Sequence, residues 1–204
     1  MTFLKICGIA SLEHAQTAVS CGANALGFVF ALSKRQITPD LARKICSLLP
    51  ETVYKVGVFV NCPRDEVKSI LTYAGLTALQ FHGDEPPEYC AIWRVPVWKG
   101  FRIQSGEDLL QLQDFAVDAY LLDASSPGSY GGTGKTCDWT LAKMAVQQGY
   151  KVILAGGLHP GNVEQAVQVV RPYGVDVSSG VETNGVKDPV LIQQFIKKVR
   201  AAGE

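Results

Sequence analysis

The feature that most constrains the fold of this chain is an alternation that repeats from one end to the other. Short apolar or β-branched runs recur, and most are followed by an amphipathic stretch of helical period. That alternation is typical of parallel strands connected by helices. We expect strands near residues 4–7, 25–30, 55–60, 78–81, 97–100, 119–122, 151–155 and 175–178. Eight such units predict a closed (β/α)8 TIM barrel of the α/β class.

Length and composition agree with one barrel domain over residues 1–204. The chain has 204 residues, near the lower end of the roughly 200 to 400 that this fold occupies. Its apolar content of 47% is enough for a sizeable core, and no composition shift divides the chain. An open doubly wound sheet is the alternative, but its G-x-G-x-x-G fingerprint is absent after the first strand, where the turn reads Cys7-Gly8-Ile9-Ala10.

Two helix starts are marked by a capping residue before a proline, Thr38 before Pro39 and Asp188 before Pro189. The apolar residues that follow each proline fall on one helical face, so we expect both stripes to be core. The two stripes comprise Leu41, Ile45, Leu48 and Leu49, and Leu191, Ile192, Phe195, Ile196 and Val199. The segment 104–117 is a weaker helix candidate, which predicts an abbreviated connection after the fifth strand.

Charge and cysteine usage exclude several classes of partner. Lys+Arg and Asp+Glu both total 19, so there is no net positive field to collect nucleic acid or an anionic membrane. The six cysteines are scattered, without a C-x-x-C pair or a Cys/His spacing typical of zinc. No signal-peptide run or long apolar span occurs. We expect a cytoplasmic protein, while a transit peptide removed earlier would leave no trace.

Glycine-rich segments after the seventh and eighth strands predict a phosphate site. Gly156 and Gly157 follow one strand, and Ser179 and Gly180 follow the next. Glycine lets the backbone approach an anion closely, and a barrel binds phosphate at these two loops and a following short helix. A single Gly-Gly pair would be read as a simple turn, whereas two sites at consecutive strand ends favour a phosphorylated small molecule.

A third glycine-rich segment, residues 130–135, follows the sixth strand. It resembles a Walker loop only superficially, because the G-x-x-x-x-G-K-[ST] spacing would need glycine where Ser129 stands. Nucleotide binding is therefore not supported. A loop that closes over the ligand and a plain flexible connection are both left open.

Reactive side chains follow three of the predicted strands at the end that faces the mouth of a barrel. Cys7 ends the first strand, His82 the fourth and Asp123 the sixth, so we expect them to share one cavity. A Cys7 thiolate would serve as a base, and a buried Asp123 would serve as an acid. The alternatives are an apolar filler for Cys7 and a loop cap for Asp123. Lys5 lies deeper on the same side of the first strand, where both a structural role and a direct role are open.

Two further side chains are candidates for binding substrate. Arg35 follows the second strand and has the paired donors that fit a carboxylate, with an ordinary surface arginine as the alternative. His82 is expected to orient a substrate or a neighbour, because no second ligand stands at metal spacing. His14 and His159 are assigned to surface or capping roles. No metal site is predicted.

Seven short motifs follow one another along the chain in a specific order and spacing. They are Lys5-Ile6-Cys7-Gly8-Ile9, Ser33-Lys34-Arg35, Val56-Gly57-Val58-Phe59-Val60-Asn61, Leu79-Gln80-Phe81-His82-Gly83, Gly132-Thr133-Gly134-Lys135, Leu154-Ala155-Gly156-Gly157-Leu158 and Asp176-Val177-Ser178-Ser179-Gly180-Val181-Glu182. Taken together, these motifs and their order resemble the phosphoribosylanthranilate isomerase family over nearly the whole chain. The resemblance implies an Amadori rearrangement of N-(5-phosphoribosyl)anthranilate to 1-(o-carboxyphenylamino)-1-deoxyribulose 5-phosphate in tryptophan biosynthesis, without metal or redox cofactor. Departures at Lys34, Phe81 and Cys137 affect neither the proposed acid nor the proposed base.

The resemblance also implies a role for each candidate. Asp123 would protonate the ribose ring oxygen and open the ring to a Schiff base, and Cys7 would remove the proton from C2. Arg35 would hold the anthranilate carboxylate. The remaining implied contacts are His82 and Asp176 near the substrate, and Gly156, Gly157, Ser179 and Gly180 on the phosphate.

Two other functions stay open from the sequence. One is another sugar-phosphate isomerase or epimerase on the same barrel, because many reactions use the same phosphate site. The other is a non-catalytic sensor of a phosphorylated ligand. Cys7 argues against the related aminoimidazole-carboxamide ribotide isomerase, in which an aspartate base is expected at that position. The oligomeric state is not readable from the sequence.

Overall fold

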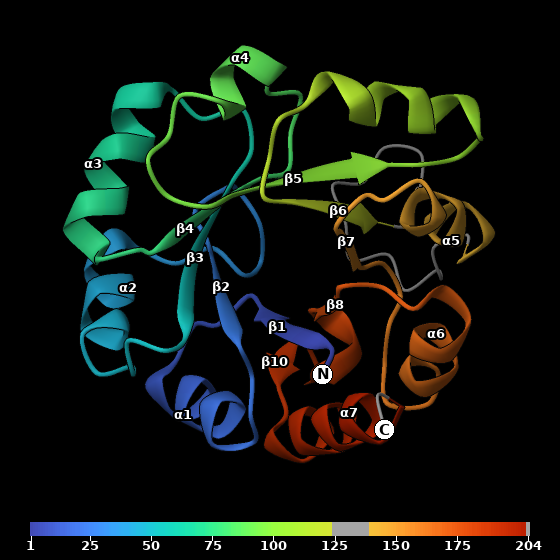
Figure 1. The fold of residues 1–204 in the computed structure, drawn as a ribbon. Coiled ribbons are helices and arrows are strands. Elements are labelled where there is room, and N and C mark those ends of the chain that lie inside the picture. Colours follow the sequence, from blue (N-terminus) through green and yellow to red (C-terminus); the bar gives the residue numbers. More distant parts are fainter. Residues whose placement is uncertain (124–138, 203–204) are drawn as a thin grey trace.

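Eight parallel strands close into a barrel, and helices pack around its outside (Figure 1). The computed structural model describes residues 1–123 and 139–202. Closure is made by β1, which pairs in parallel with β2 on one side and with β8 on the other. The barrel strands are β1 (Phe3–Cys7), β2 (Ala25–Val29), β3 (Tyr54–Phe59), β4 (Ala78–Phe81), β5 (Val97–Arg102), β6 (Ala119–Asp123), β7 (Val152–Leu154) and β8 (Gly174–Val177). The (β/α)8 barrel predicted from the sequence is confirmed.

All eight expected strands are present, and each lies within a few residues of its predicted range. The largest difference is at β5, which continues to Arg102 and pairs there with Asp123 of β6. Backbone pairing with β6 continues through Phe101 and Arg102 and so extends the strand by two residues beyond its predicted end. The pairing matters for the site because it fixes the end of β6, where Asp123 stands.

Helices and short 3₁₀ turns connect the strands on the outside of the barrel (Figure 1). The α-helices are α1 (Leu12–Ser20), α2 (Pro39–Cys46), α3 (Arg64–Ala74), α4 (Pro87–Cys90), α5 (Trp139–Gln147), α6 (Val163–Val170) and α7 (Pro189–Ala202). The 3₁₀ elements are η1 (Glu107–Asp114) and η2 (Ser179–Val181). The segment 104–117 therefore forms only a 3₁₀ helix, and the expected abbreviation of this connection is confirmed. No helix in the described ranges has the length and apolar character that a membrane crossing needs.

Both predicted helix caps are present. The Thr38 hydroxyl accepts a hydrogen bond from the Leu41 amide at 3.3 Å, and the Asp188 carboxylate accepts one from the Val190 amide at 2.9 Å. Each cap satisfies an amide that has no partner within its own helix. These two contacts fix where α2 and α7 begin, after the segments that follow β2 and β8.

The apolar stripe predicted for α7 is core, but the stripe predicted for α2 is partly wrong. Leu41 and Leu48 are 40% and 63% exposed. Helix α2 ends at Cys46, so Leu48 lies beyond it, and the buried face is made by Ala42, Ile45 and Cys46. The small side chains of Ala42 and Cys46 give a weaker apolar signal in the sequence than the two exposed leucines do.

The barrel has two apolar regions. A small set of side chains fills its interior, and Trp98 is the largest of them. A larger region between strands and helices contains most of the apolar side chains of the helices. At the amino-terminal end of the strands, Phe3 packs edge-on against Trp98 with ring centroids 5.6 Å apart. Because this end is closed by aromatic rings, the open end with the strand carboxyl termini is where a ligand can enter.

A short antiparallel hairpin after η2 was not predicted. It consists of β9 (Glu182–Thr183) and β10 (Val186–Lys187). Asn184 and Gly185 form its turn with φ values of 54° and 80°. Asn-Gly is the residue pair that such two-residue turns prefer, so the sequence did contain a signal for it. The hairpin brings Glu182 and Lys187 to the mouth of the barrel.

Candidate active site

The predicted reactive residues lie together at the carboxyl ends of the strands. A cavity of about 130 Å³ is lined by Cys7 of β1, His82 after β4, Asp123 of β6 and Asp176 of β8. A neighbouring cavity of about 50 Å³ shares Asp123 and Asp176 with it and is lined also by the glycine loops after β7 and β8. The two cavities therefore form one continuous site with a reactive part and a glycine-lined part.

Cys7 stands above a buried ion pair at the base of this site. The Lys5 ammonium lies 2.9 Å from the Asp176 carboxylate, and Lys5 is fully buried. Gly27 of β2 makes room for both β1 side chains, since a Cβ atom there would lie 2.8 Å from the Cys7 sulfur and 3.0 Å from the Lys5 nitrogen. The expected position of Lys5 beneath the mouth is confirmed. The sequence does not indicate this role of Gly27, because it depends on which residues face Gly27 from the neighbouring strand.

The electrostatic surroundings of Cys7 contain opposing influences. Burial raises the pKa of the Cys7 thiol, the ammonium of Lys5 lowers it, the carboxylate of Asp176 raises it, and Lys187 lowers it. The result is a pKa above the ordinary cysteine value. For Lys5, burial acts to lower the pKa, but Asp176 and Cys7 together raise it above the usual lysine value, so Lys5 keeps its charge. A thiolate formed at Cys7 therefore has a permanent cation beside it.

Asp123 is buried at the end of β6 and is paired with His82. The His82 Nε2 atom lies 3.2 Å from the Asp123 carboxylate, and His82 Nδ1 lies 3.3 Å from the amide nitrogen of Gln80. Gly100 of β5 leaves space for the ring, because a Cβ atom there would be 2.3 Å from His82 Nδ1. His82 therefore contacts Asp123 directly, as the expectation that it orients a neighbour requires.

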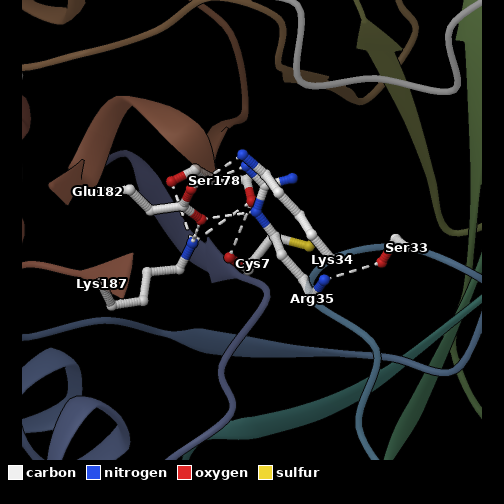
Figure 2. Close-up of polar contacts among 7 residues, drawn as sticks. All are labelled: Cys7, Ser33, Lys34, Arg35, Ser178, Glu182 and Lys187. Carbon is white, nitrogen blue, oxygen red and sulfur yellow. Dashed lines mark hydrogen bonds and ion pairs between the residues drawn. The ribbon is translucent and has the colours of Figure 1, made fainter. Parts of the chain in front are cut away.

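Arg35 reaches the site from the segment between β2 and α2, and a carboxylate of the chain itself binds it. Figure 2 shows the Arg35 guanidinium against Glu182 of β9, with distances of 2.6 Å from Nε to Oε1 and 2.9 Å from Nη2 to Oε2. Gly8 allows the approach, since a Cβ atom there would lie 2.5 Å from Arg35 Cδ. Arg35 is therefore no ordinary surface arginine.

Lys187 of β10 completes this charged cluster. Its ammonium lies 2.5 Å from Glu182 and donates to the Ser178 carbonyl at 3.1 Å, while the Ser178 hydroxyl donates to the Cys7 carbonyl at 3.2 Å (Figure 2). Burial raises the pKa of Glu182, but hydrogen bonds from Arg35 and Lys187 lower it below its usual range. The hairpin thus holds an ionised carboxylate that fixes Arg35 beside Cys7.

The glycine loops after β7 and β8 pack against each other at the smaller cavity. Gly156 and Gly157 have positive φ values of 80° and 65°, which glycine adopts without strain. Gly180 lies so close to the other loop that a Cβ atom there would be 1.8 Å from the Leu158 carbonyl oxygen. Ser179 also lines this cavity. All four predicted phosphate contacts are thus in or next to the glycine-lined part of the site.

We expect Gly180→Ala to weaken ligand binding and to destabilise the fold. The added methyl group meets backbone and not a movable side chain, so the two loops must separate. Overpacking of this kind costs about 1–3 kcal/mol. Urea unfolding gives the stability change, and titration with a phosphorylated product analogue gives the loss of affinity.

Gly106→Ala is the matched control for that experiment, because a Cβ atom at Gly106 has no heavy atom within 4 Å. Its stability and affinity should stay at wild-type values. Unchanged affinity in Gly180→Ala would show that the contact between the two loops does not shape the binding site.

The glycine-rich segment 130–135 and Cys137 lie outside the described residues. His159 has a local capping role, since its Nδ1 atom accepts a hydrogen bond from the Gly161 amide at 3.1 Å. In the described parts of the chain, no group of three or more His, Cys, Asp or Glu side chains is arranged to hold a metal ion.

Comparison with known proteins finds one family over nearly the whole chain. A family model described as N-(5'phosphoribosyl)anthranilate (PRA) isomerase matches residues 4–198. An N-(5'-phosphoribosyl)anthranilate isomerase of Desulforudis audaxviator is 52% identical over 204 residues, covering 99% of this chain and 100% of that protein. The crystal structure of phosphoribosyl anthranilate isomerase from Thermotoga maritima has a TM-score of 0.90 and 42% identity, covering 98% of this chain and 100% of that one.

A second solved structure bears directly on the ligand. It is phosphoribosyl anthranilate isomerase in complex with reduced 1-(o-carboxyphenylamino)-1-deoxyribulose 5-phosphate, with a TM-score of 0.86 and 40% identity. The match covers 98% of this chain and 100% of that chain. The ligand named there contains a carboxylate at one end and a phosphate at the other.

Proposed function

Since this chain belongs to the family of N-(5'-phosphoribosyl)anthranilate isomerases, we propose that Cys7 is the base and Asp123 the acid with which it rearranges its substrate. The chain is an isomerase of tryptophan biosynthesis. It converts N-(5-phosphoribosyl)anthranilate to 1-(o-carboxyphenylamino)-1-deoxyribulose 5-phosphate, an Amadori rearrangement by general acid–base catalysis. The observation that supports the assignment best is that Cys7 and Asp123, from strands on different sides of the barrel, line the same cavity.

Asp123 acts first in the proposed mechanism. It donates a proton to the ribose ring oxygen, the bond from that oxygen to C1 breaks, and the nitrogen lone pair forms the C1–N double bond of a protonated Schiff base. The carboxylate that remains accepts a hydrogen bond from His82, whose Nε2 atom lies 3.2 Å away. That contact stabilises the charge which appears only after the proton has left, and it therefore favours the ring-opened state.

Cys7 acts second. Its thiolate removes the proton from C2, and the electrons of that C–H bond move to form the enolamine, which tautomerises to the ketose. The ammonium of Lys5 supports the thiolate, and the ion pair of Lys5 with Asp176 holds it in place. We assign Asp176 to this positioning role and to contact with the substrate, since it lines both cavities.

Arg35 is proposed to bind the carboxylate of the anthranilate. Glu182 occupies Nε and Nη2 of the guanidinium, whereas Nη1 donates no hydrogen bond within residues 1–123 and 139–202. Arg35 lines the same cavity as Cys7. Its Nη1 atom therefore has the capacity to donate to a carboxylate bound there. The same cavity has an apolar lining that would pack against the aromatic ring of the anthranilate. This lining consists of Val29, Ala31, Leu32, Val58 and Val60.

We expect Arg35→Ala to raise KM with a smaller change in kcat. A hydrogen bond to a charged group contributes about 1.5–3 kcal/mol, which corresponds to about a 10- to 150-fold rise in KM. Arg43→Ala is the control, since Arg43 is exposed on α2 and lies over the Tyr73 ring. Steady-state kinetics distinguishes the two constants, and an unchanged KM for Arg35→Ala would remove Arg35 from substrate binding.

The phosphate is proposed to bind at Gly156, Gly157, Ser179 and Gly180 in the smaller cavity. This cavity adjoins the reactive one, so a phosphate held there leaves the ribose between Cys7 and Asp123. Binding of a remote and unreacted group aligns the reacting atoms and lowers the entropic cost of the reaction. We propose no metal or redox cofactor, because proton transfers alone complete the reaction. We propose no nucleic-acid or membrane partner, because the chain has no net positive charge.

We place the protein in the cytoplasm on the cysteine pattern. All five cysteines in the described part of the chain are free thiols, Cys7 among them. A reducing compartment keeps thiols in this form, and a base at Cys7 requires it.

Growth of a tryptophan auxotroph tests the proposed function. A bacterial strain that lacks its own phosphoribosylanthranilate isomerase should grow without tryptophan when it expresses this chain. A strain that expresses the Cys7→Ser chain to the same level should grow much more slowly. No growth with the wild-type chain, despite folded protein in the cell extract, would contradict the proposal.

A further inference from the structure

Gln80 is a buried polar residue on the inner face of the barrel that the mechanism above does not use. It lies on β4, two residues before His82, and only 2% of its surface is exposed. Its neighbours in register are Val58 of β3 and Trp98 of β5, both apolar. It nevertheless lines the same cavity as Cys7 and Asp123. A glutamine in this position must satisfy both ends of its amide or lose stability.

One end of the Gln80 amide is fixed by the catalytic acid. Once Asp123 has given its proton to the ring oxygen, its carboxylate accepts a hydrogen bond, so in the ring-opened state the facing His82 Nε2 atom is the one with the hydrogen. His82 Nδ1 is then an acceptor and needs a donor. The Gln80 amide nitrogen, 3.3 Å away, is that donor. The two linked hydrogen bonds, from His82 to Asp123 and from Gln80 to His82, therefore determine the orientation of the Gln80 amide.

The other end of the amide has no partner. The Gln80 carbonyl oxygen is buried, and it accepts no hydrogen bond from any residue that the structure describes. Leaving a buried acceptor unpaired costs about 1–3 kcal/mol. Because Gln80 lines the substrate cavity, a ligand with a hydrogen-bond donor can recover that cost when it binds.

We propose that the Gln80 carbonyl oxygen accepts a hydrogen bond from the arylamino N–H of the substrate. This inference rests on the proposed function. The nitrogen is bonded to the carbon whose ring bond breaks, and in the protonated Schiff base the same N–H belongs to a cation. A neutral acceptor binds a cationic N–H about twice as strongly as a neutral one. Gln80 thus favours the ring-opened intermediate over the ground state, and it does so from the same amide that positions His82.

Two ligands and two Gln80 variants test the proposal. One ligand is the reduced product, which has the arylamino N–H, and the other is the same molecule with an ether oxygen in place of that nitrogen. We expect the wild-type protein to bind the amine about tenfold more tightly than the ether. Gln80→Met, which has a similar shape without an acceptor, should bind the two equally. Gln80→Glu, which keeps an acceptor, should still prefer the amine.

Controls separate this contact from a purely structural role. Gln148→Met changes an exposed glutamine beyond the end of α5 and should keep the wild-type preference for the amine. A further comparison tests whether Gln80 binds the C2 hydroxyl of the reduced product instead, and it uses the 2-deoxy form, which lacks that hydroxyl. If Gln80→Met loses the preference for the ligand with the hydroxyl but keeps the preference for the amine over the ether, the assignment to N–H is wrong. Equal preferences for the amine in the wild type and Gln80→Met would also overturn it.

A measurement on the unmodified protein keeps the proposal testable if Gln80→Met does not fold. The side-chain carbonyl ¹³C resonance of Gln80 should shift when the amine binds and not when the ether binds. No shift with the bound amine would overturn the inference. Turnover of the substrate by the wild-type protein is scored separately, so the isomerase assignment can stand while the role of Gln80 fails.

Discussion

Cys7→Ser lowers kcat by about 10²- to 10⁴-fold, the contribution that a general base makes, while the affinity for a product analogue stays close to that of the wild type. Serine fits the space that Gly27 leaves beside the Cys7 sulfur. It does not ionise at neutral pH, however, so it cannot take the proton from C2. Steady-state kinetics and analogue titration measure the two quantities.

The control for Cys7→Ser is Cys21→Ser, at the end of α1 and away from the mouth of the barrel. It should keep the wild-type kcat. A kcat near normal in Cys7→Ser would remove Cys7 from the mechanism and return it to the role of an apolar filler.

The pH dependence has a definite sign if Cys7 is the base. Burial raises the pKa of the thiol above its ordinary value, and only the thiolate accepts a proton. For the wild-type enzyme, kcat/KM should therefore rise with pH as the thiol ionises. In Cys7→Ser this rise should be lost. A rise that persists unchanged in the variant would assign it to another group.

Asp123→Asn also lowers kcat by about 10²- to 10⁴-fold, for a different reason. The amide has nearly the shape of the carboxyl group but has no proton to give to the ring oxygen. The effect should be on ring opening, so a substrate analogue that is already open should bind as it does to the wild type. His82 remains a partner for the new side chain, because its Nε2 atom faces the position of Asp123.

Asp65→Asn is the control for that substitution, since Asp65 is exposed in the first turn of α3. It should have wild-type kinetics. If Asp123→Asn retains a kcat within a few-fold of the wild type, the acid must be sought elsewhere.

Much of the fold follows from the sequence because a parallel barrel leaves a strong period in it. Strands that are buried on both faces appear as continuous apolar runs, and this located all eight strands. The period was less informative for α2, where Leu41 and Leu48 were assigned to the core and are exposed. Besides Ile45, which was expected in the core, the buried face of α2 is made by Ala42 and Cys46, whose small side chains give a weak apolar signal.

The site was predictable to the extent that it depends on strand ends. Cys7, His82 and Asp123 were expected at one mouth and line one cavity. Contacts across the mouth were not predictable, because they join residues far apart in the chain. Glu182 binds Arg35 from 147 positions away, and nothing near either residue in the sequence indicates the pair.

Glycines show the same limit. Gly27 and Gly100 make room for Cys7 and His82 from neighbouring strands. In the sequence they look like weak points of two strands. Their role depends on the register of β1 with β2 and of β4 with β5, which only the structure supplies.

One measurement tests the central claim most directly. Freshly prepared N-(5-phosphoribosyl)anthranilate is incubated with the purified chain while its fluorescence is followed, and the product is identified by NMR. The account predicts loss of fluorescence at a rate proportional to protein concentration, over many turnovers, with formation of the open-chain aminoketose. A fluorescence change that stops at one equivalent of protein, or release of free anthranilate alone, would contradict it.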